Sequence, residues 1–542
     1  MKQEDLYRNK VILAPMVRVC ALPMRLLALD YGADLVYSEE QIDRKILLCQ
    51  KKENQVLHTT DFMLSDGTVV FRTCPAEKGK LILQIGTCDG KRALAAARKL
   101  QDYIAGVDVN MGCPKEFSVK GGMGAALLTQ PEKVKQILST LVSELNVPVS
   151  CKIRVLPKLE DTIKLAQLIE STGVSALAVH GRTKDERSRD PNRDDYIQAV
   201  AAAVSIPVIA NGGSKNINSL TDLENFKNTT GASSVMLARA AMWNCSVFRK
   251  QGPLPVLGVL KSYLKYAFQY DNNEMNTKYC VLQMLHDRMT EVPQADRCLT
   301  AKSLKDFADI WDMKAEYESV MEQRYAREKE LLAQQGGACN GVKRRKMDDG
   351  SVLIELPVRF DKRHYPATMT PKQILNNWSK RNGYSKPEYT TTERAGDRYY
   401  TSIVLFEGKL YTNPFWEKSK QLAEQSAAVS CLVANEQDDG RLIDPPHETE
   451  ELRRKWRHII NSSENGEDKA DSSVTNSHTE ISNSSQPNGE GKTHSSITNN
   501  HTEISDSSQP NGEDDSLVLN TQTEKQIIHS QDWTSTTDPA GK

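Results

Sequence analysis

Short apolar runs alternate with amphipathic stretches over about the first 240 residues of this chain. The runs are rich in β-branched residues, and the stretches between them place apolar residues at helical spacing. Eight runs are predicted to be strands: Val11–Met16, Ala33–Glu39, Leu81–Gly86, Val107–Met111, Val149–Arg154, Ala176–His180, Pro207–Gly212 and Ser234–Arg239. The helices predicted between them include Met24–Leu29, Gly90–Leu100, Pro131–Leu145, Glu160–Thr172 and Tyr196–Val204.

Alternation of this kind predicts parallel βα units, which two fold classes can accommodate. A doubly wound sheet needs a glycine-rich turn after its first strand, and this chain has Ala14, Pro15 and Met16 there. Eight units in about 240 residues match an α/β (β/α)8 TIM barrel, which takes about 250 residues. We therefore predict a TIM barrel over residues 1–250, with a small hairpin at Asp66–Arg72 inserted before the third strand.

The strand signals stop after about Pro253. The segments Leu257–Tyr270, Tyr279–Met289 and Lys302–Leu332 have helical spacing, which predicts an all-α domain over residues 251–335. We expect residues 336–356 to be a linker. Its basic run, Lys343–Lys346, fits a nuclear signal or an RNA contact as well as it fits a solvated linker.

A second unit is predicted over residues 357–433. Thr370 and Pro371 begin a helix, three strand-like runs follow, and an Ala-rich helix at Ser419–Val429 ends the unit. The expected order is α-β-β-β-α, with a tight turn at Glu407–Lys409 between the last two strands. Residues 353–433 hold 12 Lys and Arg against 8 Asp and Glu, so the unit is basic.

The last part of the chain, residues 434–542, is predicted to be a disordered acidic tail. It is rich in Ser, Asn, Glu and Thr, and the segment His478–Glu490 returns almost unchanged at His501–Glu513. Two copies without an apolar face cannot stack into a core, so a tandem duplication in a disordered segment is the better interpretation.

Charge and composition favour a protein that binds an anionic partner and argue against a membrane, secreted or disulfide-rich protein. The net charge of −1 hides an acidic tail, because residues 461–542 hold 14 Asp and Glu against 4 Lys and leave the rest of the chain basic. A basic body points to an anionic partner, nucleic acid first. The 11 cysteines form no CxxC pair, which argues against a structural metal site or a disulfide framework. No apolar run reaches 18 residues and Met1–Lys10 is polar, so we expect neither a membrane span nor a secretory signal.

Polar residues end nearly every predicted strand, where a barrel of this kind carries its active site. Gly212 and Gly213 after the seventh strand, and Arg239 after the eighth, suit a phosphate group. Gln84 suits a planar heterocycle and Lys152 an anionic ring. Together these are the requirements of flavin mononucleotide (FMN). Each residue alone could equally be a solvated surface residue.

The segment around Cys113 is the most specific signal. Gly112 and Pro114 fix the backbone around this thiol, and a glycine-rich loop follows at residues 120–124. No base lies beside Cys113 in the sequence, so a neutral thiol acting as a general acid is the chemical interpretation. The alternative is a buried structural cysteine.

These segments resemble those of the tRNA-dihydrouridine synthases. The matching motifs are Ala-Pro-Met at 14–16, Asn-Met-Gly-Cys-Pro at 110–114, Cys-Lys-Ile-Arg at 151–154, Val-His-Gly-Arg at 179–182 and Ala-Asn-Gly-Gly at 210–213. The basic unit resembles a double-stranded-RNA-binding domain through residues 370–378 and 418–428. The pairing of the two is similar to the animal subfamily that acts on position 20 of the tRNA D-loop.

The resemblance implies a role for each matching residue. The residues implied to hold FMN are Ala14, Pro15, Met16, Gln84, Lys152, His180, Asn211, Gly212, Gly213, Ala238 and Arg239. Cys113 would protonate C5 of uracil while the flavin delivers hydride to C6. Asn110 and Arg154 would hold the uracil, and Glu40 would line the site. The family usually has Gly-Arg where this chain has Ala238 and Arg239, a change that a backbone contact tolerates.

The RNA-binding unit departs further from its family. Two positions that are usually lysine are Gln421 and Glu424, while Lys418 and Lys420 remain. We expect phosphate contact to shift to a cluster before the first helix, made of Arg359, Lys362 and Arg363. The alternative for this cluster is a solvated leading segment.

The sequence therefore predicts an FMN-dependent enzyme that uses NADPH to reduce a D-loop uridine of tRNA. The alternatives are a flavin oxidoreductase acting on a small pyrimidine and a non-catalytic RNA-binding protein. We expect a monomer without a metal ion. We expect it in the cytoplasm, and also in the nucleus if the basic run at 343–346 is a nuclear signal.

Overall fold

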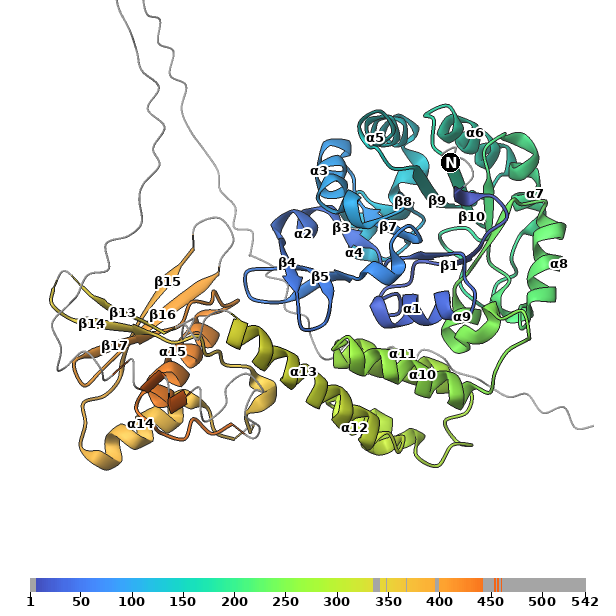
Figure 1. The fold of residues 1–542 in the computed structure, drawn as a ribbon. Coiled ribbons are helices and arrows are strands. Elements are labelled where there is room, and N and C mark those ends of the chain that lie inside the picture. Colours follow the sequence, from blue (N-terminus) through green and yellow to red (C-terminus); the bar gives the residue numbers. More distant parts are fainter. Residues whose placement is uncertain are drawn as a thin grey trace, which may run out of the picture. The chain divides into compact units, whose positions relative to one another are not determined.

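The computed structural model describes residues 6–334, 342–347, 349–366, 368–394, 399–441, 453, 454, 456, 457 and 460. Eight parallel strands close into a barrel, because β2 pairs with β1 on one side and with β7 on the other (Figure 1). The predicted TIM barrel is thereby confirmed. Its strands are β1 (Val11–Leu13), β2 (Leu35–Tyr37), β7 (Leu81–Gly86), β8 (Gly106–Met111), β9 (Val149–Arg154), β10 (Ala176–His180), β11 (Val208–Asn211) and β12 (Ser234–Leu237).

Helices cover the outside of the barrel. They are α1 (Leu22–Asp30), α3 (Gly90–Leu100), α5 (Pro131–Glu144), α6 (Leu159–Glu170), α7 (Asp194–Ala203) and α8 (Leu220–Thr230). Helix α8 was not among the predicted helices, because its sequence is polar and ends in two threonines. It buries Leu223, Phe226 and Thr230, and Ser219 caps its first turn by accepting from the Asp222 N–H.

The insertion before β7 is larger than the predicted hairpin. It is a three-stranded antiparallel sheet of β4 (Gln50–Asn54), β5 (Thr59–Met63) and β6 (Val69–Thr73), preceded by the short β3 (Gln41–Ile42) and α2 (Asp43–Leu48). The prediction found the turn and β6 alone. The strand β4 is largely exposed and polar, so it carries no alternating apolar pattern.

The helical region contains α10 (Val256–Gln269), α11 (Glu274–Leu285), α12 (Leu304–Ile310) and α13 (Lys314–Gln334). The single helix predicted at 302–332 is broken between α12 and α13, where Asp312 adopts a left-handed φ of 54°. Leu260 and Leu264 of α10 belong to the same apolar core as Met24 and Leu27 of α1. The barrel and the helical region therefore share one core.

The second domain has its own core and a five-stranded sheet, in the order β13-β14-β17-β16-β15. The predicted order is confirmed by α14 (Pro371–Asn382), β15 (Glu388–Glu393), β16 (Tyr400–Phe406), β17 (Lys409–Thr412) and α15 (Lys420–Ala434). Thr370 caps α14 as predicted, accepting from the Gln373 N–H while the Gln373 side chain accepts from the Thr370 N–H.

The structure extends this domain at both ends of the predicted range. The expected linker contains β13 (Lys343–Lys346) and β14 (Val352–Glu355), an antiparallel pair that joins the sheet through β17. After the expected end, Trp456 and Ile460 are buried in the domain's core. Part of the region predicted to be disordered therefore packs, whereas the repeat at 478–513 lies outside the described residues.

Two further findings concern the described part of the chain. No helix there is long and apolar enough to cross a membrane. Those same residues contain no group of three His, Cys, Asp or Glu side chains that could hold a metal ion.

Candidate functional site

The predicted barrel residues lie together at the carboxyl ends of the strands. Pairing aligns Asn110 of β8 with Lys152 of β9, and His180 of β10 with Asn211 of β11. Leu13 pairs with Leu237, which brings the segment that begins at Ala14 beside Ala238. The parallel sheet thus gathers residues that are up to 225 positions apart into one end of the barrel.

Cys113 lies in a tightly held turn after β8. The side-chain oxygen of Asn110 accepts from the N–H groups of Gly112 and Cys113, at 3.0 Å each. The loop that follows returns to the same residue, because the Ala125 N–H donates to the Cys113 carbonyl at 2.9 Å. Gly124 has a φ of 57°, and an added Cβ would lie 3.0 Å from the Cys113 Cβ. The turn thus fixes the position of the thiol.

A buried network of polar side chains on β7, β8 and β9 supports this turn. The amide nitrogen of Asn110 donates to Gln84 at 3.3 Å, and Gln84 donates to Asp108 at 2.9 Å. The other oxygen of Asp108 accepts from Ser150 at 2.8 Å. Burial raises the pKa of Asp108 to about 6, although the hydrogen bonds from Gln84 and Ser150 favour its ionised form.

Sequence reasoning missed Asp108 and Ser150. Asp108 lies within an apolar strand run, and an isolated acidic residue between valines was the available signal. Gln84 was predicted to face a cofactor and Asn110 a uracil. In the structure both amides are engaged in this network, which orients them.

The thiol of Cys113 is half-buried, and its surroundings keep it protonated. Burial raises the pKa of Cys113, and the nearby Glu40 carboxylate raises it further. Burial also raises the pKa of Glu40, to about 7. A neutral thiol can donate a proton, which is the general-acid role that the sequence predicted.

The rim beside Cys113, beginning with β9, is strongly cationic. Burial and the neighbouring Arg154 lower the pKa of Lys152 to about 8. Burial and Arg182 lower the pKa of Arg239. Burial and four surrounding cations lower the pKa of His180 well below its usual value, which leaves the ring neutral. Like charges held this close stabilise an anion placed between them.

The glycine turn after β11 adds backbone donors to this rim. Gly212 and Gly213 have φ values of 131° and 61°, conformations that favour glycine. The carboxamide of Asn192 lies directly on Gly212, where an added Cβ would be 2.0 Å from its oxygen. That oxygen is buried without a hydrogen-bond partner in the described structure. Sequence reasoning missed Asn192, which lies in a polar loop without a motif.

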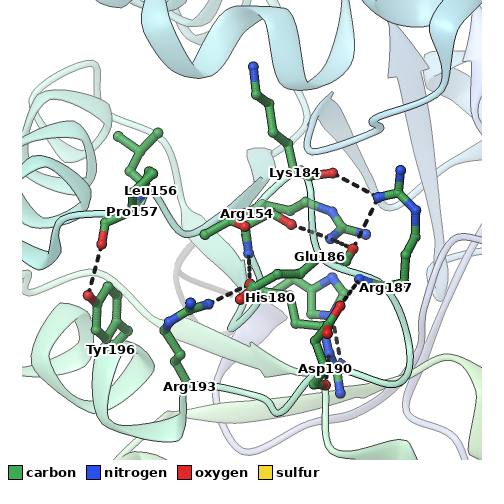
Figure 2. Close-up of polar contacts among 12 residues, drawn as sticks. Arg154, Leu156, Pro157, His180, Lys184, Glu186, Arg187, Asp190, Arg193 and Tyr196 are labelled. Carbon is green, nitrogen blue, oxygen red and sulfur yellow. Dashed lines mark hydrogen bonds and ion pairs between the residues drawn. The ribbon is translucent and has the colours of Figure 1, made fainter.

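Arg154 is directed into the loop after β10, as Figure 2 shows. Its guanidinium donates to the main-chain oxygens of Thr183, at 2.8 Å, and Glu186, at 3.4 Å. The loop is closed by Glu186, which accepts from the Thr183 N–H at 2.6 Å and pairs with Arg193 at 2.5 Å (Figure 2). The loop therefore orients the arginine that was predicted to hold uracil.

Arg239 is also supported by aromatic stacking. Its guanidinium lies 5.7 Å from the ring centroid of Trp243. The other partner of Trp243 is His286, which stacks on it at 5.0 Å between ring centroids. Neither aromatic residue was among the predicted site residues, because α9 (Arg239–Trp243) and His286 at the end of α11 are separated in the sequence.

The predicted basic cluster of the second domain is not uniformly available to solvent. Arg359 forms a two-bond ion pair with buried Glu417, at 2.9 and 2.8 Å, which ties its segment to the domain. Lys362, Lys418 and Lys420 are exposed. The side chain of Arg363 lies outside the described residues.

Comparison with known proteins identifies two regions of this chain. A sequence model of the family described as dihydrouridine synthase (Dus) matches residues 12–286, and one of the double-stranded RNA binding motif matches residues 371–433.

The chain is 39% identical over 320 residues to a Schizosaccharomyces pombe protein named tRNA-dihydrouridine(20) synthase [NAD(P)+]. That alignment covers 57% of this chain and 66% of the relative. This chain is also 35% identical over 351 residues to a Saccharomyces cerevisiae protein of the same name. That alignment covers 60% of this chain and 91% of the relative.

The second domain is similar to a solved double-stranded-RNA-binding domain of a tRNA-dihydrouridine(20) synthase. The identity is 43% and the TM-score 0.16, over 17% of this chain and 96% of that one.

Proposed function

The chain belongs to the dihydrouridine synthase family, and from this premise we propose that it reduces a uridine of tRNA to 5,6-dihydrouridine. It is accordingly an NAD(P)-dependent oxidoreductase. The two yeast relatives are named for position 20, and we propose the same D-loop position for this chain. The single observation that carries the proposal is the neutral thiol of Cys113, held beside a cationic rim at the barrel's opening.

The rim fits FMN as the cofactor. Arg239 and the Gly212–Gly213 turn suit its phosphate, and Lys152 suits the anionic ring of a reduced flavin. The unpartnered oxygen of Asn192 suits a hydroxyl or imide donor at the same place. The other residues proposed to hold it are Ala14, Pro15, Met16, Gln84, His180, Asn211 and Ala238. Bound and reduced, FMN supplies the hydride for C6 of uracil.

The chain's own residues supply the proton and the alignment. Cys113 donates from its sulfur to C5, which its raised pKa permits because the thiol is protonated at neutral pH. Asn110 keeps the sulfur in place through the two N–H groups of the turn. The loop after β10 orients Arg154, and we propose that this arginine binds a uracil oxygen.

The second domain is proposed to contribute tRNA affinity through phosphate and 2′-hydroxyl contacts. Exposed Lys362, Lys418 and Lys420 are the candidate contacts, together with Arg363. We further propose NADPH as the preferred reductant, a monomeric state and a cytoplasmic location, with entry into the nucleus through the basic run at 343–346.

Replacing the thiol tests the function. Cys113→Ala is expected to retain FMN and to be reduced by NADPH, whereas dihydrouridine in tRNA forms roughly 10²–10⁴-fold more slowly. Cys88→Ala is the matched control, because Cys88 is also half-buried and lies near the same loop, and its sulfur accepts from Arg92 at 3.3 Å. Product formed by Cys113→Ala at the wild-type rate would show that another group is the acid.

Substrate class is tested in the same assay. We expect turnover on tRNA and none on free uridine at equal concentration, since a free base needs no RNA-binding domain. Faster reduction of the free pyrimidine would support a small-molecule flavin oxidoreductase instead.

A further inference from the structure

Glu40 is a buried acid that faces the reactive thiol. It follows β2, and its carboxyl lies against the end of β7, where a Cβ added to Gly86 would be 2.6 Å from Oε1. Oε1 is buried and has no hydrogen-bond partner in the described structure. Cys113 follows β8, the strand that pairs with β7, so the Glu40 carboxyl and the thiol lie at neighbouring strand ends. In keeping with this, each of the two groups affects the pKa of the other.

The surroundings of Glu40 favour its protonated form. Among the described residues Glu40 forms no ion pair, and burial raises its pKa to about 7. Burial also raises the pKa of the preceding residue, Glu39, but there the Arg18 N–H and the charges of Arg25 and Lys45 act against that rise. Glu40 is therefore an acid that still carries a proton in a large fraction of molecules near pH 7, beside a thiol.

The reaction leaves Cys113 in need of a proton. Transfer of its S–H proton to C5 produces a thiolate in a half-buried position. The described groups that act on this sulfur are Glu40 after β2, the Lys115 N–H, the Ser118 hydroxyl of α4 (Glu116–Lys120), and Lys152 and Arg154 of β9. Arg154 does not give up its proton. Lys152 is assigned to the flavin. A main-chain N–H and a serine hydroxyl are far weaker acids than a carboxyl, so Glu40 is the remaining acid.

We propose that Glu40 returns the proton to Cys113 after each reduction, a step that rests on the proposed function. The O–H bond of the Glu40 carboxyl breaks as the S–H bond forms, and the carboxylate takes a proton from water when the product leaves. Glu40 then does more than line the site, the role that the resemblance implied, because it donates a proton to the enzyme.

The relay predicts a difference between first and later turnovers. Cys113 begins protonated, so Glu40→Gln, which cannot donate a proton in this way, is expected to reduce tRNA in a single turnover within about threefold of wild type. Its steady-state rate is expected to fall roughly 10²-fold, the usual contribution of a proton-transfer group. Glu39→Gln is the matched control and is expected to change neither rate.

A second readout needs neither tRNA nor flavin reduction. The Glu40 carboxylate raises the pKa of Cys113, so alkylation of Cys113 by iodoacetamide, followed by peptide mass, is expected to begin at lower pH in Glu40→Gln. In Glu39→Gln the alkylation profile is expected to match wild type. An unchanged profile in Glu40→Gln would show that the two groups do not interact.

The remaining outcomes also decide the matter. If Glu40→Gln lowers the single-turnover and steady-state rates equally, Glu40 acts in substrate binding and the relay is overturned. Wild-type rates in both assays would also overturn the relay. If Glu40→Gln does not fold, the pH dependence of the wild-type enzyme provides the test. Its steady-state rate should decline above about pH 7, whereas its single-turnover rate should not. A wild type that makes no dihydrouridine would instead refute the proposed function.

Discussion

Substitution of Gly124 by alanine tests whether the loop after β8 fixes the position of the Cys113 thiol. The residue has a φ of 57°, and a Cβ there would lie 2.6 Å from the Cys113 carbonyl oxygen and 3.0 Å from its Cβ. Ordinary van der Waals contact begins at 3.4 Å. Because the Cys113 carbonyl is main chain and accepts from Ala125, relief requires the turn itself to move.

The expected cost has two parts that a matched variant separates. An L-residue in the left-handed conformation costs about 1–2 kcal/mol, and overpacking a tight site costs about 1–3 kcal/mol. Gly122 has a φ of 70°, but an added Cβ there would meet nothing closer than 3.6 Å. Gly122→Ala should therefore lose about 1–2 kcal/mol, and Gly124→Ala about 2–5 kcal/mol.

The free energy of unfolding and the single-turnover rate of tRNA reduction are measured for both variants. A displacement of the thiol on the order of 1 Å should lower single-turnover reduction of tRNA by about 10²-fold in Gly124→Ala. Gly122→Ala should stay within a few-fold of wild type, and reduction of the flavin by NADPH should be unchanged in both. Equal turnover numbers for the two variants would refute the claim that the loop positions Cys113.

Three further predictions concern other parts of the molecule. Arg239→Ala should lose flavin on purification, because a charge-assisted phosphate contact contributes about 1.5–3 kcal/mol; full occupancy at low FMN would place the phosphate elsewhere. Ending the chain after Gln334 should keep FMN binding, since the barrel and helical region share one core, and should weaken tRNA binding and its salt dependence. Affinity and salt slope equal to those of the full chain would contradict this role for the second domain. The hydrogen bonds to Arg193 and Thr183 lower the pKa of Glu186 to about 2 from 4.5, so its contribution to stability is complete above pH 4.5 and is lost towards pH 2. The melting temperatures of wild type and Glu186→Gln should therefore differ at pH 6 and approach each other on acidification, and a difference as large at pH 2.5 as at pH 6 would assign the effect to another group.

The barrel was predictable because its signal is local. Strands such as β9 and β10 are buried on both faces, so their apolar runs end where the strands end. The edge strand of the insertion, β4, could not be predicted from the sequence, because it is exposed and its conformation depends on pairing with β5. The same holds for β13, a basic run whose strand character comes from its partner β14.

The candidate site followed from strand ends, but its supporting contacts did not. Cys113 and Arg239 follow strands directly, and a barrel places such residues at one opening. Asp108, Asn192 and Glu186 act through neighbours that are distant in sequence or lie in loops, where single-sequence patterns hold no distance information. Arg359 was assigned to RNA by its charge, and the buried partner Glu417, 58 residues later, could not be foreseen.

The barrel and the second domain bury separate sets of apolar side chains, which has a consequence for cooperativity. Helices α10 to α13 have no core of their own, since Leu264 and Phe307 belong to the barrel's cluster, whereas Trp456 completes the cluster of the second domain. Calorimetry should therefore resolve two unfolding transitions, and the helical region should melt with the barrel. A fragment that begins at residue 342 and continues past Ile460 should refold alone, whereas one confined to 357–433 should lose two strands and the Trp456 contact and melt earlier.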